Sequence, residues 1–256
     1  KQGWQISARL VVGADGRNSI CREAAHIPAS VQQDEQAAIA TSFTHAAPHR
    51  GVSIELHRKG GSVTTVPLTD AFSSSVIWVG ESAEIDGLMR LDAKGLETAL
   101  AGRLDGLFGR IGEIGARAHF PVTRLNAESL VGPRTALVGE AGHVLPPIGA
   151  QGLNLGLRDV ATLADCVGAA LTRGGDPGSD EVLSAYDRAR KLDVLTRTLG
   201  IDLLSRSLLS GFLPIQAVRG VVSYGLNALP PLRRLVIRIG MEPPTELPSL
   251  MRPPSH

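Results

Sequence analysis

The chain has 256 residues, with 26 Lys and Arg against 25 Asp and Glu, and a formal net charge of +1. This balance excludes a strongly basic surface and predicts no nucleic-acid partner. The apolar content of 43% and charged content of 20% are typical of a globular protein. The two cysteines, Cys21 and Cys166, match no metal-ligand spacing, so we predict no metal site, buried thiols and a reducing, cytoplasmic compartment.

Apolar periodicity and the positions of Gly and Pro divide the chain into elements. In chain order the predicted elements are strands over 4–14, a helix over 18–25, strands over 37–44, 51–58, 62–68 and 73–79, a helix over 93–108, strands over 116–122 and 135–138, and helices over 152–173 and 181–204. The four strands between 37 and 79 are spaced as in an antiparallel sheet with one covered face.

The segment 203–241 is apolar and basic, with five arginines and no acidic residue. Glycines and prolines divide it into short helices, so it cannot cross a membrane as one span. Two interpretations remain open: a helical layer packed on the preceding domain, which we favour for 203–213, or a contact with anionic lipid or a partner protein. We expect the tail, 242–256, to be disordered.

One long motif occupies residues 136–159: a buried strand, a sharp turn, a Pro-Pro loop and a helix that opens with glycines. The start of such a helix presents unpaired backbone N–H groups at the positive end of its dipole. This arrangement suits a phosphate or a reduced cofactor ring. The alternative is that the glycines only permit close packing of helix on sheet, and we favour the cofactor interpretation.

A second motif occupies residues 10–22, where a strand ends in the Asp15-Gly16 turn and a helix follows with Ser19 and Arg22 one turn apart. Alone, an Asp-Gly turn is commonplace. Together, the two motifs resemble those of the class A flavin-dependent aromatic hydroxylases. The subgroup that hydroxylates ubiquinone precursors is the most similar, and the resemblance covers about residues 8–215.

The resemblance implies an α/β fold with α+β character: part of a Rossmann-like FAD-binding domain, an inserted antiparallel sheet and a C-terminal helical region. The expected domains are 1–32 and 129–178 for FAD binding, 33–128 for the substrate sheet, and 179–256 for C-terminal helices and tail. No two glycines are separated by a single residue, so the Gly-x-Gly-x-x-Gly fingerprint is missing. We therefore expect the later part of a longer protein, inactive by itself.

The resemblance also implies which residues bind FAD: Asp15, Gly139, Glu140, Pro147, Gly149, Ala150, Gln151, Gly152, Leu153 and Asn154. Glu140 stands where the family has an Asp near the ribityl chain, and Ala150 replaces a glycine. A structural turn for Asp15 and a solvent-facing carboxylate for Glu140 are the alternatives. We expect His143 to fix its loop, and Arg158 and Asp159 to form helix-surface or interdomain ion pairs.

The function implied is that of an FAD-dependent monooxygenase that hydroxylates an aromatic ring with NAD(P)H and O2. The expected substrate is a ubiquinone precursor, which can be polyprenylated, and the expected location extends to the inner face of the membrane. Phe43, Phe72, Trp78 and Phe120 either line the substrate pocket or belong to the core, which is commoner for aromatic residues on strands. No catalytic side chain is assigned. The alternatives are another aromatic or prenyl substrate, or a non-catalytic interaction scaffold.

Overall fold

The computed structural model describes residues 3, 5–58, 60–147, 151–209, 229–231, 234 and 247–252. The chain forms two compact units, the first from 1–32, 123–204 and 217–256, the second from 33–122 and 205–216. Two long strands, β2 (Ala29–His45) and β7 (Ala118–Ala127), each have residues in both units. Within the described ranges, no helix combines the length and the apolar character needed to cross a membrane.

The first unit holds both sequence motifs. Besides the ends of β2 and β7, it contains β1 (Val11–Gly13), α1 (Ile20–Ala24), β8 (Val131–Gly132), β9 (Thr135–Leu137), the 3-10 turn η1 (Gly139–Ala141), β10 (His143–Val144), α4 (Gln151–Thr172), most of α5 (Asp180–Leu209) and the 3-10 turn η2 (Ser249–Met251). A small sheet has the order β1-β9-β8, in which β1 and β9 are parallel and β8 is antiparallel to β9.

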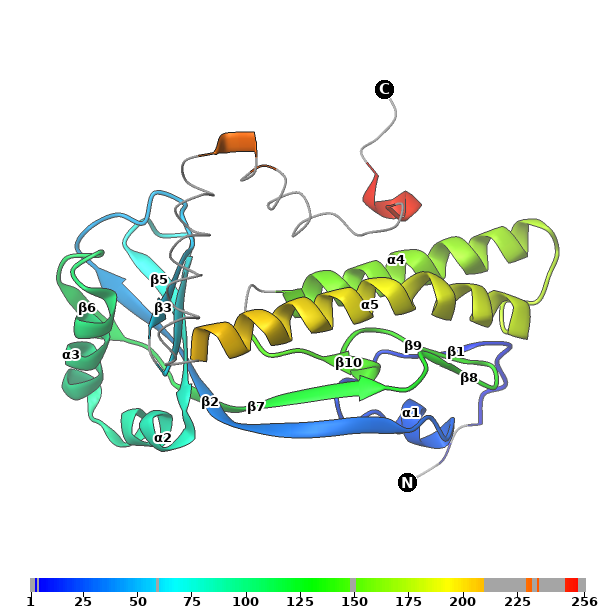
Figure 1. Ribbon diagram of the computed structural model, residues 1–256, viewed down its shortest axis with the longest axis horizontal. Helices are drawn as coiled ribbons and strands as arrows, with labels where there is room; N and C mark the ends of the chain where they lie inside the picture. Colours follow the sequence, from blue (N-terminus) through cyan, green and yellow to red (C-terminus); the bar gives the residue numbers. More distant parts are fainter. Residues whose placement is uncertain are drawn as a thin grey trace. The chain divides into compact units, whose positions relative to one another are not determined.

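The helices α4 and α5 run side by side in this unit (Figure 1) and share an apolar core with β9. Leu155 and Leu163 of α4 pack with Leu183 and Tyr186 of α5, and all four are buried. A long amphipathic helix gains most of its stability from such packing rather than from its intrinsic propensity.

The second unit is built on an antiparallel sheet, as the strand spacing predicted. It contains β3 (Ile54–Arg58), β4 (Gly61–Pro67), β5 (Ser73–Glu81), α2 (Ser82–Arg90), α3 (Ala93–Leu104) and β6 (Ile111–Ile114) with most of β2. The strand order in the larger sheet is β10-β7-β2-β5-β4-β3, with β6 paired to β2.

The register places one row of apolar side chains under the two helices. Ile39 pairs with Trp78, and Trp78 pairs with Val63, so these three side chains point to one face of the sheet. They pack with Ile85 of α2 and Leu100 of α3 in one core. The alternation of apolar and polar residues along the strands therefore decides which face is covered.

Several predicted boundaries were wrong. Among the described residues of the strands expected over 4–14, only Val11–Gly13 form a strand, and α2 and β6 were not predicted. The helix expected to reach residue 108 ends at Leu104, because Asp105 adopts the left-handed conformation, with φ 51°. Of the tail expected to be disordered, 242–256, only residues 247–252 are described. There the expectation was wrong, because the backbone N–H of Ser249 in η2 donates to Asp165 Oδ2 at 2.8 Å.

Truncation in the core of the second unit tests this packing. Leu100 is 1% exposed, so Leu100→Ala should lower the free energy of unfolding by about 2–5 kcal/mol through lost burial and the cavity left behind. The matched control is Leu107→Ala, since Leu107 is 48% exposed. Chemical denaturation followed by circular dichroism measures both. Equal losses for the two variants would contradict the core assignment.

Candidate functional site

The two sequence motifs meet at one edge of the small sheet. Because β1 and β9 are parallel and Gly13 pairs with Leu137, the turns that follow both strands leave at the same edge. Arg22 Nη1 donates to the carbonyl of Ala141 at 2.8 Å, across 119 residues of sequence. Ligands of α/β sheets bind at the carboxyl ends of parallel strands, which is where these turns lie.

An ion pair also joins the two motifs at this edge. Arg17 Nε lies 3.4 Å from Glu140 Oε2, and the Glu140 side chain is 54% exposed. Such an exposed pair contributes little to stability. Because more than half of the Glu140 side chain is exposed, its carboxylate is accessible at the surface, beside the turn that holds Asp15.

Local hydrogen bonds engage both carboxylate oxygens of Asp15. Ser19 Oγ donates to Oδ1 at 2.6 Å, and the backbone N–H of Cys21 donates to Oδ2 at 3.1 Å. Ser19 is also the N-cap of α1, since its hydroxyl accepts from the backbone N–H of Arg22. The hydrogen bond from Ser19 is the main cause that lowers the pKa of Asp15 to about 2. These bonds match the structural-turn alternative for this side chain.

Two glycines allow the Gly139 turn to touch α4. Gly139 has a φ of 61°, which side-chain-bearing residues rarely adopt. A Cβ on Gly156 would lie only 3.2 Å from Gly139 Cα, so the helix and the turn are in direct contact. The absence of a side chain at Gly156 therefore permits close packing of α4 on the Gly139 turn.

The first turn of α4 is open to the surface. Gln151 is half-buried, whereas Gly152, Leu153 and Asn154 are exposed, Leu153 at 74%. A Cβ built on Gly152 would meet nothing within 4 Å. The first four N–H groups of a helix have no partner within the helix, so this turn can receive a ligand with hydrogen-bond acceptors.

Of the remaining predicted site residues, Pro147 lies exposed in the loop before α4. The other two, Gly149 and Ala150, are outside the described residues, as is almost all of the segment 210–241. The space beside Gly152, the exposed Glu140 carboxylate and the open helix turn nevertheless fit a cofactor that has hydroxyl groups and a ring with acceptor atoms.

Asp159 is fully buried and organises the Gly139 turn, so its prediction as a surface or interdomain residue was wrong. Its Oδ2 accepts from the backbone N–H of Gly139 at 2.9 Å and lies 2.6 Å from His143 Nε2. Arg190 Nε of α5 donates to Oδ1 at 2.7 Å. His143 thus helps to fix its loop, but it does so through a buried carboxyl partner that sequence proximity did not reveal.

The network continues along α5. Arg190 Nη1 donates to Asp193 Oδ2 at 2.8 Å, and Arg197 Nε donates to Asp193 Oδ1 at 2.8 Å. Burial alone would raise the pKa of Asp193, but the hydrogen bonds and charges of Arg190 and Arg197 hold it below its usual value. Arg158 is also buried, with Nη1 3.5 Å from Asp193 Oδ2, and was wrongly expected at the surface.

Tyr186 ties α5 to the small sheet. Its hydroxyl donates to the carbonyl of Leu137 at 2.7 Å. Burial raises the pKa of Tyr186 well above its usual value, so the hydroxyl stays protonated and keeps donating. Leu137 is the last residue of β9, directly before the Gly139 turn.

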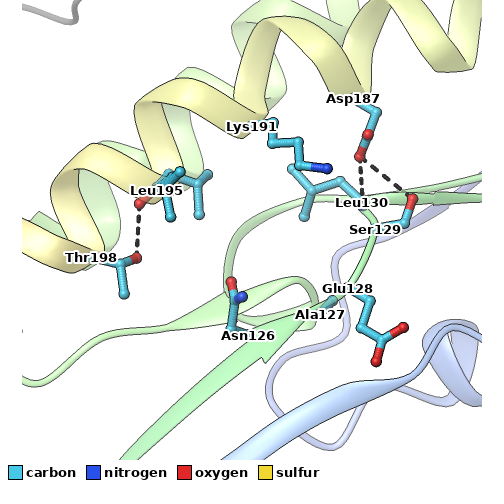
Figure 2. Close-up of a pocket in the computed structure, with 10 residues that line it drawn as sticks. Asn126, Ala127, Glu128, Ser129, Leu130, Asp187, Lys191, Leu195 and Thr198 are labelled. Carbon is cyan, nitrogen blue, oxygen red and sulfur yellow. Dashed lines mark hydrogen bonds between the residues drawn. The ribbon is translucent and has the colours of Figure 1, made fainter.

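A separate cavity of about 120 Å³ lies between α5 and the β7–β8 connection (Figure 2). Asp187 at its rim accepts from the backbone N–H of Leu130 at 2.9 Å and from Ser129 Oγ at 3.4 Å. The cavity shares no lining residue with the predicted FAD-binding set. It is also smaller than the roughly 300 Å³ expected of a small-molecule site, so it does not hold a flavin ring.

The four aromatic residues considered for a substrate pocket divide into two groups. Phe43 and Trp78 belong to the core of the second unit. Phe72, which lies in the turn before β5 rather than on a strand, is 47% exposed, and Phe120 of β7 is 48% exposed. Cys21 and Cys166 are free thiols of intermediate exposure rather than fully buried.

Removing the Ser19 hydroxyl tests the origin of the Asp15 pKa. Ser19→Ala should raise the pKa of Asp15 from about 2 toward 3.8. Because the pKa in the folded state is below the unfolded value, the wild-type contribution to stability is present above pH 4 and is lost as the pH falls toward 2. NMR titration of the carboxyl groups measures the shift. The lowered pKa of Asp176, which depends on Arg134, serves as the control and should not change.

The chain is similar in sequence to known hydroxylases. The chain is 34% identical to the ubiquinone hydroxylase UbiL of Rhodospirillum rubrum over 249 residues, which cover 94% of this chain and 58% of that protein. It is 31% identical to the 3-demethoxyubiquinol 3-hydroxylase of Escherichia coli over 221 residues, 86% of this chain and 56% of that protein. The chain thus spans little more than half the length of these curated relatives.

A solved structure shares the fold. The p-nitrophenol 4-monooxygenase PnpA of Pseudomonas putida DLL-E4 superposes with a TM-score of 0.72 at 17% identity, over 93% of this chain and 60% of that one. The resemblance to class A flavin-dependent hydroxylases of ubiquinone biosynthesis is confirmed, as is the mixed α/β fold. A family profile described as an FAD binding domain matches residues 1–197. Because this match covers well over half of the chain, the chain belongs to the FAD-binding domain family.

Proposed function

We propose that this chain is the larger part of an FAD-dependent monooxygenase that hydroxylates the aromatic ring of a ubiquinone precursor. The observation that carries the proposal is the meeting of two distant motifs at the carboxyl ends of β1 and β9, beside the open first turn of α4. The two ubiquinone-pathway hydroxylases similar to this chain support the choice of substrate class.

Each element of this edge has a role toward FAD. The Glu140 carboxylate, exposed beside Arg17, would accept hydrogen bonds from ribityl hydroxyl groups. The N–H groups of Gln151–Asn154 would face the acceptor atoms of the ring, where the helix dipole favours negative charge by up to about 2 kcal/mol. Asp15, Gly139, Pro147, Gly149 and Ala150 would complete the binding set. When bound, FAD supplies the hydride acceptance from NAD(P)H and the oxygen activation that ring hydroxylation requires.

A charge placed in the first turn of α4 tests the proposed orientation of FAD. Leu153→Asp adds a negative charge at an exposed position of a helix start, which is compatible with folding but opposes negative charge on the ring. Because only the reduced ring carries this charge, we expect the reduced form to lose about tenfold in affinity relative to the oxidised form, the equivalent of 1.4 kcal/mol. The measurement is the midpoint potential of FAD bound to the full-length gene product, which should become more negative.

The matched control is Leu157→Asp, one turn further along α4, where Leu157 is 51% exposed. It should change the midpoint potential much less, since the dipole effect is confined to the first turn. Equal shifts in both variants would contradict the proposed orientation. A colourless full-length protein that cannot be reconstituted with FAD would overturn the enzyme assignment and favour the scaffold alternative.

The substrate class is tested separately from cofactor binding. The flavin-loaded protein should oxidise NAD(P)H faster in the presence of a ubiquinone-precursor phenol and should return the hydroxylated ring. Hydroxylation of other phenols with the quinone precursors left unchanged would favour the alternative of a different aromatic substrate.

We also propose peripheral contact of residues 214–241 with an anionic membrane surface, where a polyprenylated substrate would be found. The support is the sequence of this segment, which has four arginines and no acidic residue. We expect the protein to sediment with anionic liposomes at low salt and to be released as salt rises. Absence of sedimentation at low salt would remove this proposal.

A further inference from the structure

One face of α5 carries four polar residues that all point to the same part of the first unit. Tyr186, Arg190, Asp193 and Arg197 are spaced by four, three and four positions, so they lie along a single stripe of the helix. Tyr186 binds Leu137, Arg190 binds Asp159, and Arg190 and Arg197 bind the two oxygens of Asp193. We call these four residues the α5 stripe.

The stripe ends at the first turn of α4. Arg197 Nη1 donates to the side-chain oxygen of Gln151, the first residue of α4, at 2.9 Å. At the other end of the path, Asp159 accepts from the backbone N–H of Gly139. A continuous set of hydrogen bonds therefore links Gly139 to Gln151 through Asp159, Arg190, Asp193 and Arg197.

These contacts are shielded from water. The side chains of Asp159 and Asp193 are 0% exposed, that of Arg190 is 2% exposed and that of Arg197 is 9% exposed. Buried ion pairs are often no more stabilising than apolar residues of similar size, so stability alone does not account for this one. A buried network of fixed geometry instead specifies one arrangement of the parts that it joins.

We propose that Arg197 is a positioning residue, which holds the first turn of α4 in the orientation that receives the flavin. The proposal rests on the proposed function, because the turn it holds is the one assigned to FAD. The guanidinium group of Arg197 makes two contacts: Nε donates to Asp193, and Nη1 donates to the side-chain oxygen of Gln151. The planar fork of arginine can make both contacts at once, whereas a lysine ammonium lacks this geometry.

The contacts of Arg197 with Asp193 and with Gln151 can be tested separately by substitution. Arg197→Lys keeps a positive charge beside Asp193 and removes the fork that also reaches Gln151. Gln151→Met removes only the acceptor and leaves every ion pair of the network in place. The control is Arg188→Gln, which removes an exposed arginine of the same helix outside the α5 stripe.

The full-length gene product is measured in three ways: the FAD dissociation constant, the midpoint potential of bound flavin and the melting temperature without FAD. We expect Arg197→Lys and Gln151→Met each to weaken FAD binding about tenfold, as for loss of a hydrogen bond made by a charged group. Both should shift the midpoint potential to more negative values, because displaced N–H donors stabilise the reduced ring less. The double variant should be no worse than either single variant.

The outcomes distinguish the two proposals. If the wild-type protein binds no FAD, the proposed function fails. If the wild type binds FAD but both variants keep its affinity and potential, the proposed function stands and the positioning role of Arg197 is wrong. A fall in melting temperature with unchanged affinity and potential would show a purely structural role. Losses in the double variant that multiply would show that the two residues act independently, which also overturns the proposal.

Discussion

The parallel pairing of β1 with β9 is the interaction on which the candidate site depends. Residues 10–22 and 136–159 are separated by more than a hundred positions, and neither forms a site alone. Once Gly13 pairs with Leu137, both strands end at one edge, and the Asp15 turn and the Gly139 turn become neighbours. The bond from Arg22 to Ala141 and the pair between Arg17 and Glu140 then form across that edge.

The buried charges have a different role from the apolar core. Leu155, Leu163, Leu183 and Tyr186 hold α4 against α5 through non-directional packing, which tolerates small shifts. The bonds of Asp159 are directional, since one carboxyl group engages the Gly139 turn, His143 and Arg190 at fixed distances. The core therefore stabilises the pair of helices, and the charge network joins both helices to the turn through directional contacts.

Much of the fold followed from local pattern. The strands between 37 and 79 and the helices that begin near residues 93, 152 and 181 were predicted, because their apolar periodicity reflects the face that each buries. The predicted helix end at 108 was wrong, because the left-handed conformation of Asp105 has no strong sequence signal. The short helix α2 was missed because its nine residues include a glycine and lie directly after a strand.

The sequence by itself determined the family, the α/β character and the positions of the two motifs, since turns and helix starts depend on residues near in sequence. It did not reveal that Asp159, Arg158 and His143 are buried or which partners they have. Each of these side chains sits on a short element or helix whose polar residues would ordinarily face water. Only the packing of α5 on α4 brings Arg190 to Asp159 and Asp193 to Arg158, and His143 in turn pairs with Asp159. Such long-range pairing is decided by tertiary structure because it depends on which helix faces meet.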